Sequence, residues 1–321
     1  CACMDSAHGG MPVPLEGYIG MPEPSAANWY HSGFLFIQVN GQDVGSTPLS
    51  SMTLAERGER GIVDMVWYHQ LAAVRVRFLG LANHDMLYCE ITLEPRGELE
   101  TVTVHLRCYP SFFTAAYGRN GARRIETPGT VVSQGERVTL PAAEHWWALY
   151  SDAVFDVGRG AGEGPCAMMI LPQEASEVTF APGSYAVNTT VTYPPGTTRM
   201  RLAFWDFKGM SNADALARMG EGAQTDRAEL ETLDFTPAAV RGFNVGALRQ
   251  QLARAMSSPE VQALLGDRMT EVRDWMEQLA PKLEEDPRNL SIAGQENLLR
   301  AVDRYYSFQW EVMLAELLAG L

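Results

Sequence analysis

The sequence predicts an α+β protein, with a large antiparallel β-sandwich followed by an all-helical C-terminal region. From residue 29 to residue 207, apolar and polar residues alternate with a period of two, in short runs separated by turns rich in Gly, Pro and Asn. After residue 207 the apolar residues recur three and four positions apart, as on one face of a helix. Strands and helices do not alternate along the chain, so a parallel βαβ fold is not expected.

This change of period divides the 321 residues into three regions. We expect residues 1–27 to be a tether or extended segment, residues 28–207 to form the β-sandwich domain and residues 208–321 to form the helical region. Because 46% of the residues are apolar, the chain can bury enough surface to fold, which excludes intrinsic disorder.

Three runs show the strand pattern most clearly, namely residues 74–78, 87–93 and 101–108. Their apolar positions, which we expect on the inner face, are Val74, Val76, Phe78, Leu87, Cys89, Ile91, Leu93, Val102, Val104, Leu106 and Cys108. If the last two runs form a hairpin, Cys89 and Cys108 meet across it. They are then either a disulfide or two small buried apolar residues.

The helical region carries signals for where its helices begin. Ser211 with Asp214 three residues later, and Ser258 before Pro259, are typical of helix N-termini. An apolar stripe in the last helix comprises Leu299, Val302, Tyr306, Met313 and Leu317. Such a stripe either packs in a core or docks a partner, and core packing is the commoner outcome.

Charge and the N-terminal residues restrict the partners. The 39 acidic and 25 basic side chains give a net charge of −14, which argues against nucleic-acid binding, because that needs clustered Lys and Arg. No stretch approaches the roughly 18 consecutive apolar residues of a membrane helix. Cys1 and the small residues after it are typical of a mature bacterial lipoprotein, which predicts export and membrane attachment only through a lipid on Cys1. The alternative is that the sequence begins internally.

Motifs for common cofactors are absent from the sequence. It contains no Walker loop, GxSxG elbow, HExxH or paired CxxC motif, and its five cysteines lack metal-ligand spacing. We therefore expect neither a cofactor nor a bound metal. The glycine-rich residues 158–164 do not fit dinucleotide-loop spacing and are expected to form a surface loop.

Aromatic and acidic residues are densest in residues 144–156. Indole and phenol rings stack on the apolar faces of sugars, while neighbouring carboxylates and imidazoles hydrogen-bond sugar hydroxyls. Trp146, Trp147 and Tyr150 are therefore candidate glycan-binding residues. The competing interpretation is a buried strand whose rings fill the core.

A second candidate site comes from the polar positions of the strands. The side chains expected to point away from the core are Arg75, Arg77, Tyr88, Glu90, His105, Arg107, Arg199 and Arg201. If their strands are neighbours, they form a locally basic sheet face on which Arg75 and Arg77 bind an acidic polysaccharide. The commoner alternative is a face of cross-strand ion pairs.

Four segments resemble uncharacterised secreted bacterial proteins: residues 108–113, 146–156, 164–166 and 202–207. The β region is also similar in style to the galactose-mutarotase-like supersandwich of carbohydrate-active enzymes. This resemblance implies a supersandwich fold and a carbohydrate-related role. It implies no catalytic residue, because His105, His145 and Glu144 do not match the contexts of the mutarotase residues.

These observations favour an exported, carbohydrate-associated binding protein. One alternative is a lyase, hydrolase or epimerase acting on acidic sugars, whose acid–base candidates are His105, Arg107 and Glu90, or His145 and Asp152. Another is a structural or assembly protein whose helical tail docks a partner. The sequence leaves the ligand and the oligomeric state open.

Overall fold

The computed structural model describes residues 2–3, 18–19, 28–29, 33–110, 122–155, 164–241, 245–283 and 289–320. Cys1, the glycine-rich residues 158–163 and residues 111–113 of the first resembling segment lie outside the described residues.

The strands are β1 (Ala2–Cys3), β2 (Tyr18–Ile19), β3 (Leu35–Val39), β4 (Gln42–Asp43), β5 (Leu49–Glu56), β6 (Arg60–Tyr68), β7 (Ala72–Leu81), β8 (Met86–Pro95), β9 (Val102–Cys108), β10 (Arg123–Thr127), β11 (Thr130–Ser133), β12 (Val138–Pro141), β13 (Trp147–Asp152), β14 (Cys166–Ile170), β15 (Glu177–Pro182), β16 (Val187–Tyr193) and β17 (Arg199–Asp206). The helices are α2 (Asn212–Thr232), α3 (Ala238–Arg241), α4 (Val245–Ser257), α5 (Pro259–Leu265), α6 (Arg268–Leu283) and α7 (Ile292–Leu318).

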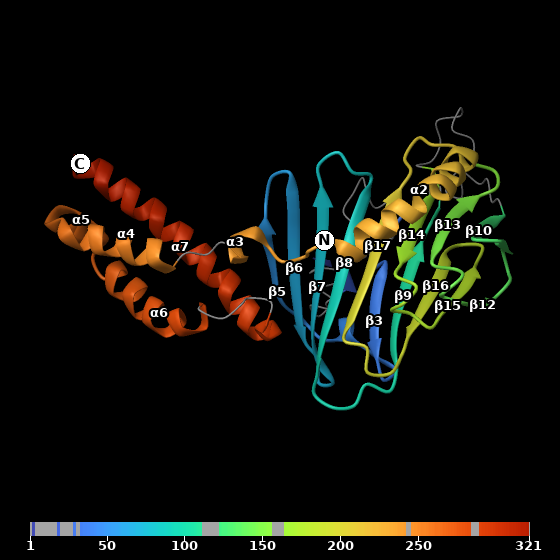
Figure 1. The fold of residues 1–321 in the computed structure, drawn as a ribbon, viewed down its shortest axis with the longest axis horizontal. Helices are drawn as coiled ribbons and strands as arrows, with labels where there is room; N and C mark the ends of the chain where they lie inside the picture. The colour runs from blue at the N-terminus through green and yellow to red at the C-terminus, as the bar shows by residue number, and fades with distance from the viewer. Residues whose placement is uncertain are drawn as a thin grey trace, which may run out of the picture. The chain divides into compact units, whose positions relative to one another are not determined.

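The predicted α+β class is confirmed, because two large antiparallel sheets are followed by helices (Figure 1). Sheet A has the strand order β1-β2-β3-β9-β16-β15-β12, with β4 paired to β3. Sheet B has the order β11-β10-β13-β14-β17-β8-β7-β6-β5. The two sheets form a sandwich around one hydrophobic core.

The inner faces follow the period-two alternation of the sequence. Of the apolar residues expected there, Leu87 is partly buried and the others are buried. At the centre of the core the Trp29 ring lies 5.1 Å from the Phe204 ring and 5.9 Å from the Tyr150 ring, between centroids. These contacts join the N-terminal residues to strands of sheet B.

The hairpin that would bring Cys89 and Cys108 together is not formed, and the two residues fit the alternative of small buried apolar side chains. Between β8 and β9 the chain crosses from sheet B to sheet A, so the two cysteines lie in different sheets. Both are buried and free. Alternation shows which side of a strand is apolar, but it does not show which strand is its neighbour.

Helix α2 covers part of the outer face of sheet B (Figure 1). Its buried residues Ala215, Met219, Ala223 and Leu230 belong to the same hydrophobic core as the sheets. As a result, the first compact unit comprises residues 1–235 and the second comprises residues 236–321. The division lies after α2 and not at residue 207, where the sequence changes period, because the sheet holds this helix.

The second unit has a core of its own. Leu248 and Leu252 of α4, Val261 of α5 and Phe308 and Val312 of α7 are buried together. Among the described residues, no helix has both the length and the hydropathy that a membrane span requires.

The apolar stripe expected on the last helix divides into two parts in α7. Leu299 and Val302 are buried, whereas Tyr306, Met313 and Leu317 are exposed. Trp310, which is 70% exposed, lies on the same exposed side. Core packing therefore accounts for the first part of the stripe only.

Ion pairs attach α2 to the turn before β8. Arg218 contacts Asp226 at 2.8 Å and Asp85 at 3.3 Å, and these partners raise the pKa of the guanidinium. The same helix brings Glu229 within 3.5 Å of His84. Gly222 leaves room for the Arg218 side chain, since a Cβ at this position would lie 2.0 Å from Nη1 of Arg218.

Replacing two glycines of α2 tests this packing. Gly220→Ala, where a Cβ meets nothing within 4 Å, is expected to raise the free energy of unfolding by about 0.5–1 kcal/mol through helix propensity. Gly222→Ala is expected to gain less or to destabilise, because Arg218 has to move away from the buried Asp226. Urea unfolding of both variants measures the difference, and equal gains would contradict the proposed role of Gly222.

Candidate functional site

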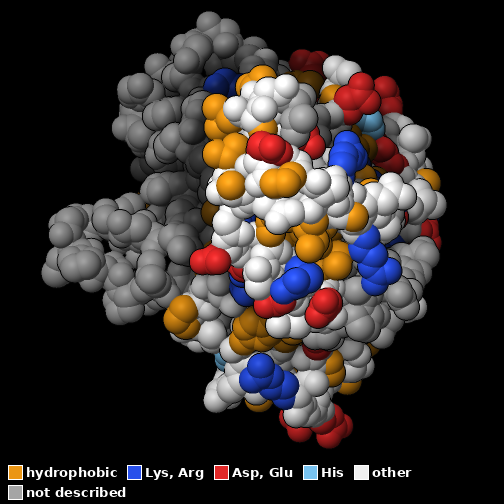
Figure 2. Space-filling view, turned by 90° about the vertical axis from the view of Figure 1, so that its left-hand side faces the viewer, with side chains coloured by type: hydrophobic (Ala, Val, Ile, Leu, Met, Phe, Trp, Pro, Cys, Tyr) orange, Lys and Arg blue, Asp and Glu red, His pale blue; other side chains and the backbone are white. Residues whose placement is uncertain are grey.

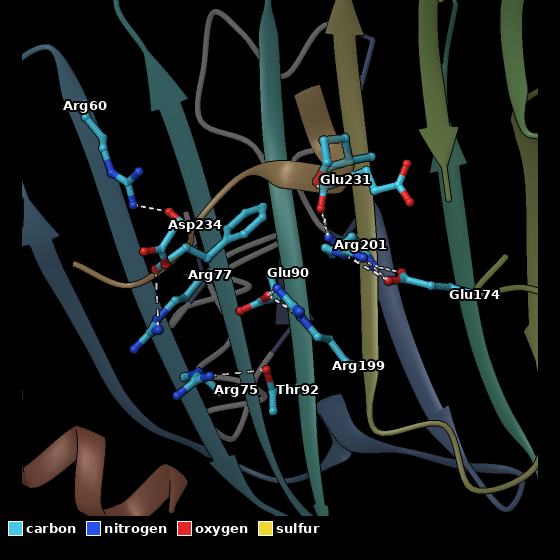
Figure 3. A network of polar contacts seen from close by, with 12 residues as sticks. Arg60, Arg75, Arg77, Glu90, Thr92, Glu174, Arg199, Arg201, Glu231 and Asp234 are labelled. Carbon is cyan, nitrogen blue, oxygen red and sulfur yellow. Dashed lines mark hydrogen bonds and ion pairs between the residues drawn. The ribbon is translucent and has the colours of Figure 1, made fainter. Parts of the chain in front are cut away.

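The polar face expected on the strands is present in part, on the outer side of sheet B. Strand β8 lies between β7 and β17, and Glu90 is in register with Arg77 on one side and Arg201 on the other. Figure 3 shows these side chains together with Arg75 and Arg199. His105 and Arg107 do not join this face, because β9 belongs to sheet A.

Ion pairs neutralise three arginines of this face, whereas Arg75 donates a hydrogen bond to the Thr92 hydroxyl at 3.3 Å. Arg77 contacts Asp64 of β6 at 2.5 Å, and their side chains are only 3% and 2% exposed. Arg199 contacts Glu90 at 2.6 Å, and Arg201 contacts Glu174 at 2.7 Å (Figure 3). The face is therefore a network of ion pairs, as in the alternative interpretation.

The end of α2 and the residues after it cover Arg77 and Arg201 of the network, whereas the Arg199 side chain is 51% exposed. Arg201 donates a hydrogen bond to the carbonyl of Glu231, 2.5 Å away (Figure 3). Arg77 donates to the carbonyl of Phe235 at 3.4 Å. Burial lowers the pKa of Arg75 to about 10, with the charge of Arg77 contributing. Arg75 and Arg77 are both buried and make no accessible surface for a polysaccharide in this structure.

The aromatic candidates lie in the sandwich core. Trp146, Trp147 and Tyr150 are 6%, 8% and 1% exposed. The Tyr150 hydroxyl is 2.8 Å from Oγ1 of Thr189 in the opposite sheet, and the Arg227 guanidinium of α2 covers the Trp146 ring at 4.9 Å. In this structure their rings offer no free face on which a sugar can stack, which agrees with the core interpretation.

Of the two catalytic groupings, His145 with Asp152 is not brought together. His145 precedes β13 and Asp152 ends it, so the extended backbone separates them by about 20 Å. Both are buried, and Asp152 lies 3.2 Å from Arg123. Burial raises the pKa of Asp152, although the Val154 amide and Arg123 oppose the shift.

The other catalytic grouping, of His105, Arg107 and Glu90, is also not brought together. His105 and Arg107 lie on the outer face of sheet A, whereas Glu90 lies on sheet B. Strand register places His105 between Phe36 of β3 and Thr190 of β16. Its Nδ1 is 2.9 Å from Oγ1 of Thr190, and its Nε2 is 3.2 Å from Oγ1 of Thr103. These two hydroxyls fix the orientation of the imidazole.

Arg107 is exposed and is held at the surface by two neighbours. Its guanidinium lies 5.4 Å from the centroid of the Phe36 ring, and its Nε donates to Oδ1 of Asn188 at 3.5 Å. A guanidinium stacked on an aromatic ring in this way keeps its other N–H groups directed outwards.

Two adjoining depressions flank Arg107. One, of about 300 Å³, is lined by Phe36, Gln38, Asp43, His105, Leu106, Arg107, Asn188 and Thr189. The other, of about 400 Å³, is lined by Arg107, Tyr109, Gly183, Ser184, Tyr185, Ala186 and Asn188. Arg107 and Asn188 are common to both. We call the outer face formed by Phe36, Asp43, His105, Arg107, Tyr185 and Asn188 the sheet A surface.

Tyr185 gives the sheet A surface an exposed aromatic ring. It is 68% exposed, and it packs edge-on against the buried Tyr109 with the ring centroids 4.8 Å apart. Sequence reasoning misses Tyr185 because it follows the turn glycine Gly183, outside any periodic pattern. The sequence feature that could have indicated Tyr185 is a single tyrosine within a turn.

Asp43 adds a carboxylate near two histidines. Its side chain accepts a hydrogen bond from the Gly45 amide at 2.8 Å and caps a short 3-10 turn, Val44–Ser46. Burial raises the pKa of Asp43, although the Gly45 amide and the charges of His105 and His69 oppose the shift. Burial also lowers the pKa of His105 and of His69. Burial therefore shifts the pKa of each of the three groups in the direction of its neutral form.

Metal and charge features do not add a second candidate. Within the described ranges, no group of three or more His, Cys, Asp or Glu side chains is arranged to hold a metal ion. On the face drawn in Figure 2, the coloured basic, acidic and hydrophobic side chains are interspersed, without a region of one charge.

No protein-family model and no curated protein sequence matches the chain. Among solved structures, an α-N-acetylgalactosaminidase of Bifidobacterium bifidum overlaps 69% of this chain and 35% of its own, with 11% identity and a TM-score of 0.44. A heparan sulfate lyase of Pedobacter heparinus overlaps 54% of this chain and 24% of its own, with 7% identity and a TM-score of 0.34. An α-galactosidase of Geobacillus stearothermophilus overlaps 55% and 30%, with 9% identity and a TM-score of 0.33.

These three neighbours are carbohydrate-active enzymes, and this chain spans about a third or less of each. Overlaps of this size identify neither a ligand nor a reaction for this chain.

Removing a buried arginine tests the ion-pair network. Arg77→Leu is expected to lower the free energy of unfolding by about 3–5 kcal/mol, because Asp64 keeps a buried charge without its partner. Arg124→Leu, the control, removes an exposed ion pair with Glu126 on β10 and is expected to cost about 0–1 kcal/mol. Urea unfolding measures both, and similar small losses would show that the buried pair is not a major stabilising contact.

Acidification tests the environment of the two histidines. The pKa values of His105 and His69 are lower in the folded protein than their usual 6.5, so their contribution to stability is complete above that pH and is lost as the pH falls through the folded-state values. The raised pKa of Asp43 acts in the opposite direction, since protonation of this carboxyl favours the folded state. We expect the free energy of unfolding to fall from about pH 7.5 to about pH 5.5, and the double variant His69→Gln/His105→Gln to lose less. An unchanged pH dependence in this variant would contradict the assignment.

Proposed function

We propose that the protein binds a carbohydrate on the sheet A surface. The observation that carries the proposal is the exposed Tyr185 ring beside Arg107 and Asn188, along two adjoining depressions. An exposed aromatic ring next to hydrogen-bonding side chains is the combination that a sugar site requires. The buried Trp146 and Trp147 are not part of this site.

Each group of the surface has a role in such binding. The Tyr185 ring stacks on a pyranose face, and its edge-on contact with Tyr109 restrains it before the ligand arrives. The Asn188 amide hydrogen-bonds sugar hydroxyls, since it has both donor and acceptor groups. At the far side of Arg107, His105 and Asp43 provide further polar contacts.

Arg107 favours an acidic sugar as the ligand. Its guanidinium presents N–H groups that match the two oxygens of a carboxylate, as in a uronate. Stacking on Phe36 limits its motion and so reduces the entropy lost on binding. The acidic chain thereby offers a local cation to an acidic polysaccharide, on sheet A instead of on the Arg75 and Arg77 face.

A second candidate function, acid–base chemistry on acidic sugars, is favoured by one observation. Asp43 and His105 line the same depression and interact electrostatically, and both have pKa values shifted by burial. A carboxyl and an imidazole poised in this way match a general acid and a general base. Turnover of a uronate polysaccharide that Asp43→Asn abolishes would support it, whereas binding without turnover supports the binding role.

Two substitutions test the binding proposal. Tyr185→Ala and Arg107→Ala are each expected to weaken polysaccharide binding about tenfold or more, equivalent to about 1.4 kcal/mol, because stacking or carboxylate contacts are lost. Arg107→Ala should weaken binding of uronate polymers more than binding of neutral ones. Affinity gel electrophoresis with a panel of neutral and uronate polysaccharides gives the comparison.

The matched controls are Tyr306→Ala, an exposed tyrosine of α7, and Arg124→Ala, an exposed arginine of β10. Both should bind as the unsubstituted protein does. Unfolding midpoints verify that all four variants are folded. The proposal fails if no polysaccharide of the panel binds, or if binding survives both substitutions in the sheet A surface.

A further inference from the structure

At one end of the sandwich, a single residue joins the end of β9 to the start of β14. Asn28 accepts a hydrogen bond from the Tyr109 amide through its carbonyl, at 2.6 Å. Its side-chain amide donates to the Pro165 carbonyl at 3.5 Å and to Oδ1 of Asp206 at 2.5 Å. Tyr109 follows Cys108, and Pro165 precedes Cys166, so these contacts bring the two cysteines to the same place from opposite sheets.

Contacts inside the core place the two thiols together. The Cys108 and Cys166 side chains lie close enough to interact, and both residues are buried. Trp29 pairs with Cys108 through its backbone, while its indole N–H donates to the Trp205 carbonyl in sheet B at 3.0 Å. Tyr150, in register with Cys166, interacts with both thiols.

Cys89 has a different environment. Within sheet B it is in register with Phe78 and Leu202, and it interacts with Tyr193 of sheet A. It is also buried and free, which makes it an internal control for thiol reactivity.

We propose that Cys108 and Cys166 form a disulfide that links the two sheets when the chain folds in the presence of a disulfide oxidant. Two S–H bonds break and one S–S bond forms between the cysteines. The disulfide of the oxidant, such as oxidised glutathione, accepts the two electrons and two protons and becomes two thiols. Exported proteins fold where such oxidants act, so the proposed bond agrees with the predicted location.

The bond forms during folding and not afterwards. Burial raises the pKa of Cys166, and the neighbouring Cys108 side chain adds to the shift, so in the folded protein the thiol is seldom the reactive thiolate. Once formed, the bond closes the loop from residue 108 to residue 166 and reduces the conformational freedom of the unfolded chain. It also fixes the strand end that carries Tyr109, the support of Tyr185.

Refolding of the full chain from urea tests the proposal, with glutathione buffer that is either oxidised or fully reduced. Free thiols are then blocked with N-ethylmaleimide, and proteolytic peptides are mapped by mass spectrometry. We expect the oxidised sample to contain a linked pair of peptides carrying Cys108 and Cys166, lighter than their sum by two hydrogen atoms, with Cys89 alkylated after denaturation. The oxidised protein should also unfold at a higher urea concentration than the reduced protein.

Two variants keep the test decisive. Cys89→Ala should retain the difference in urea midpoint between oxidised and reduced samples, whereas Cys166→Ala should lose it. Alkylation of both Cys108 and Cys166 in the oxidised sample, or a link from either one to another cysteine, overturns the proposal. Peptide mapping of the unsubstituted protein gives this answer even if a variant fails to fold.

Discussion

The ion pair between Arg77 and Asp64 lies almost out of contact with water, beneath the residues that follow α2. An arginine on a sheet face is normally solvated, and covering it is costly unless a carboxylate and carbonyl oxygens replace the lost water. The network from Asp64 to Glu174 supplies these replacements for Arg77 and Arg201. Because these contacts are made, α2 and its following residues can lie on sheet B as part of the first unit.

The cover over Arg77 and Arg201 on sheet B contrasts with the exposed outer face of sheet A, where we propose that the ligand binds. The two described depressions lie on the outer side of sheet A, where Arg107, Asn188 and Tyr185 remain exposed. The two faces use arginine in opposite ways. On sheet B, Arg201 is paired with the carboxylate of Glu174. On sheet A, Arg107 is stacked on the Phe36 ring and is exposed to solvent. The proposed preference for an acidic sugar follows from this difference.

The sequence predicts the features that depend on local pattern, such as buried strand positions and helix caps. It does not predict which strands are neighbours in space. Alternation correctly indicates the buried Val74, Val76 and Val104, and the Ser211 cap marks the start of α2. Alternation also turns His105 and Arg107 outwards, but it cannot assign them to sheet A, because the crossover after β8 leaves no mark in the pattern. For the same reason alternation does not show that Cys89 and Cys108 lie in different sheets. Tyr185 belongs to no periodic run, so its role depends on the neighbouring Tyr109, which only the fold provides.

The outer face of sheet A is the proposed ligand-binding surface. Hydrogen–deuterium exchange of the full chain, with and without a uronate oligosaccharide, tests it most directly because it reports on both sheets at once. We predict slower exchange on ligand addition in the peptides of β3, β9 and residues 183–190, with β7, β8 and β13 unchanged. Protection confined to β13 or to the Arg75 and Arg77 strands, with none on sheet A, would contradict it.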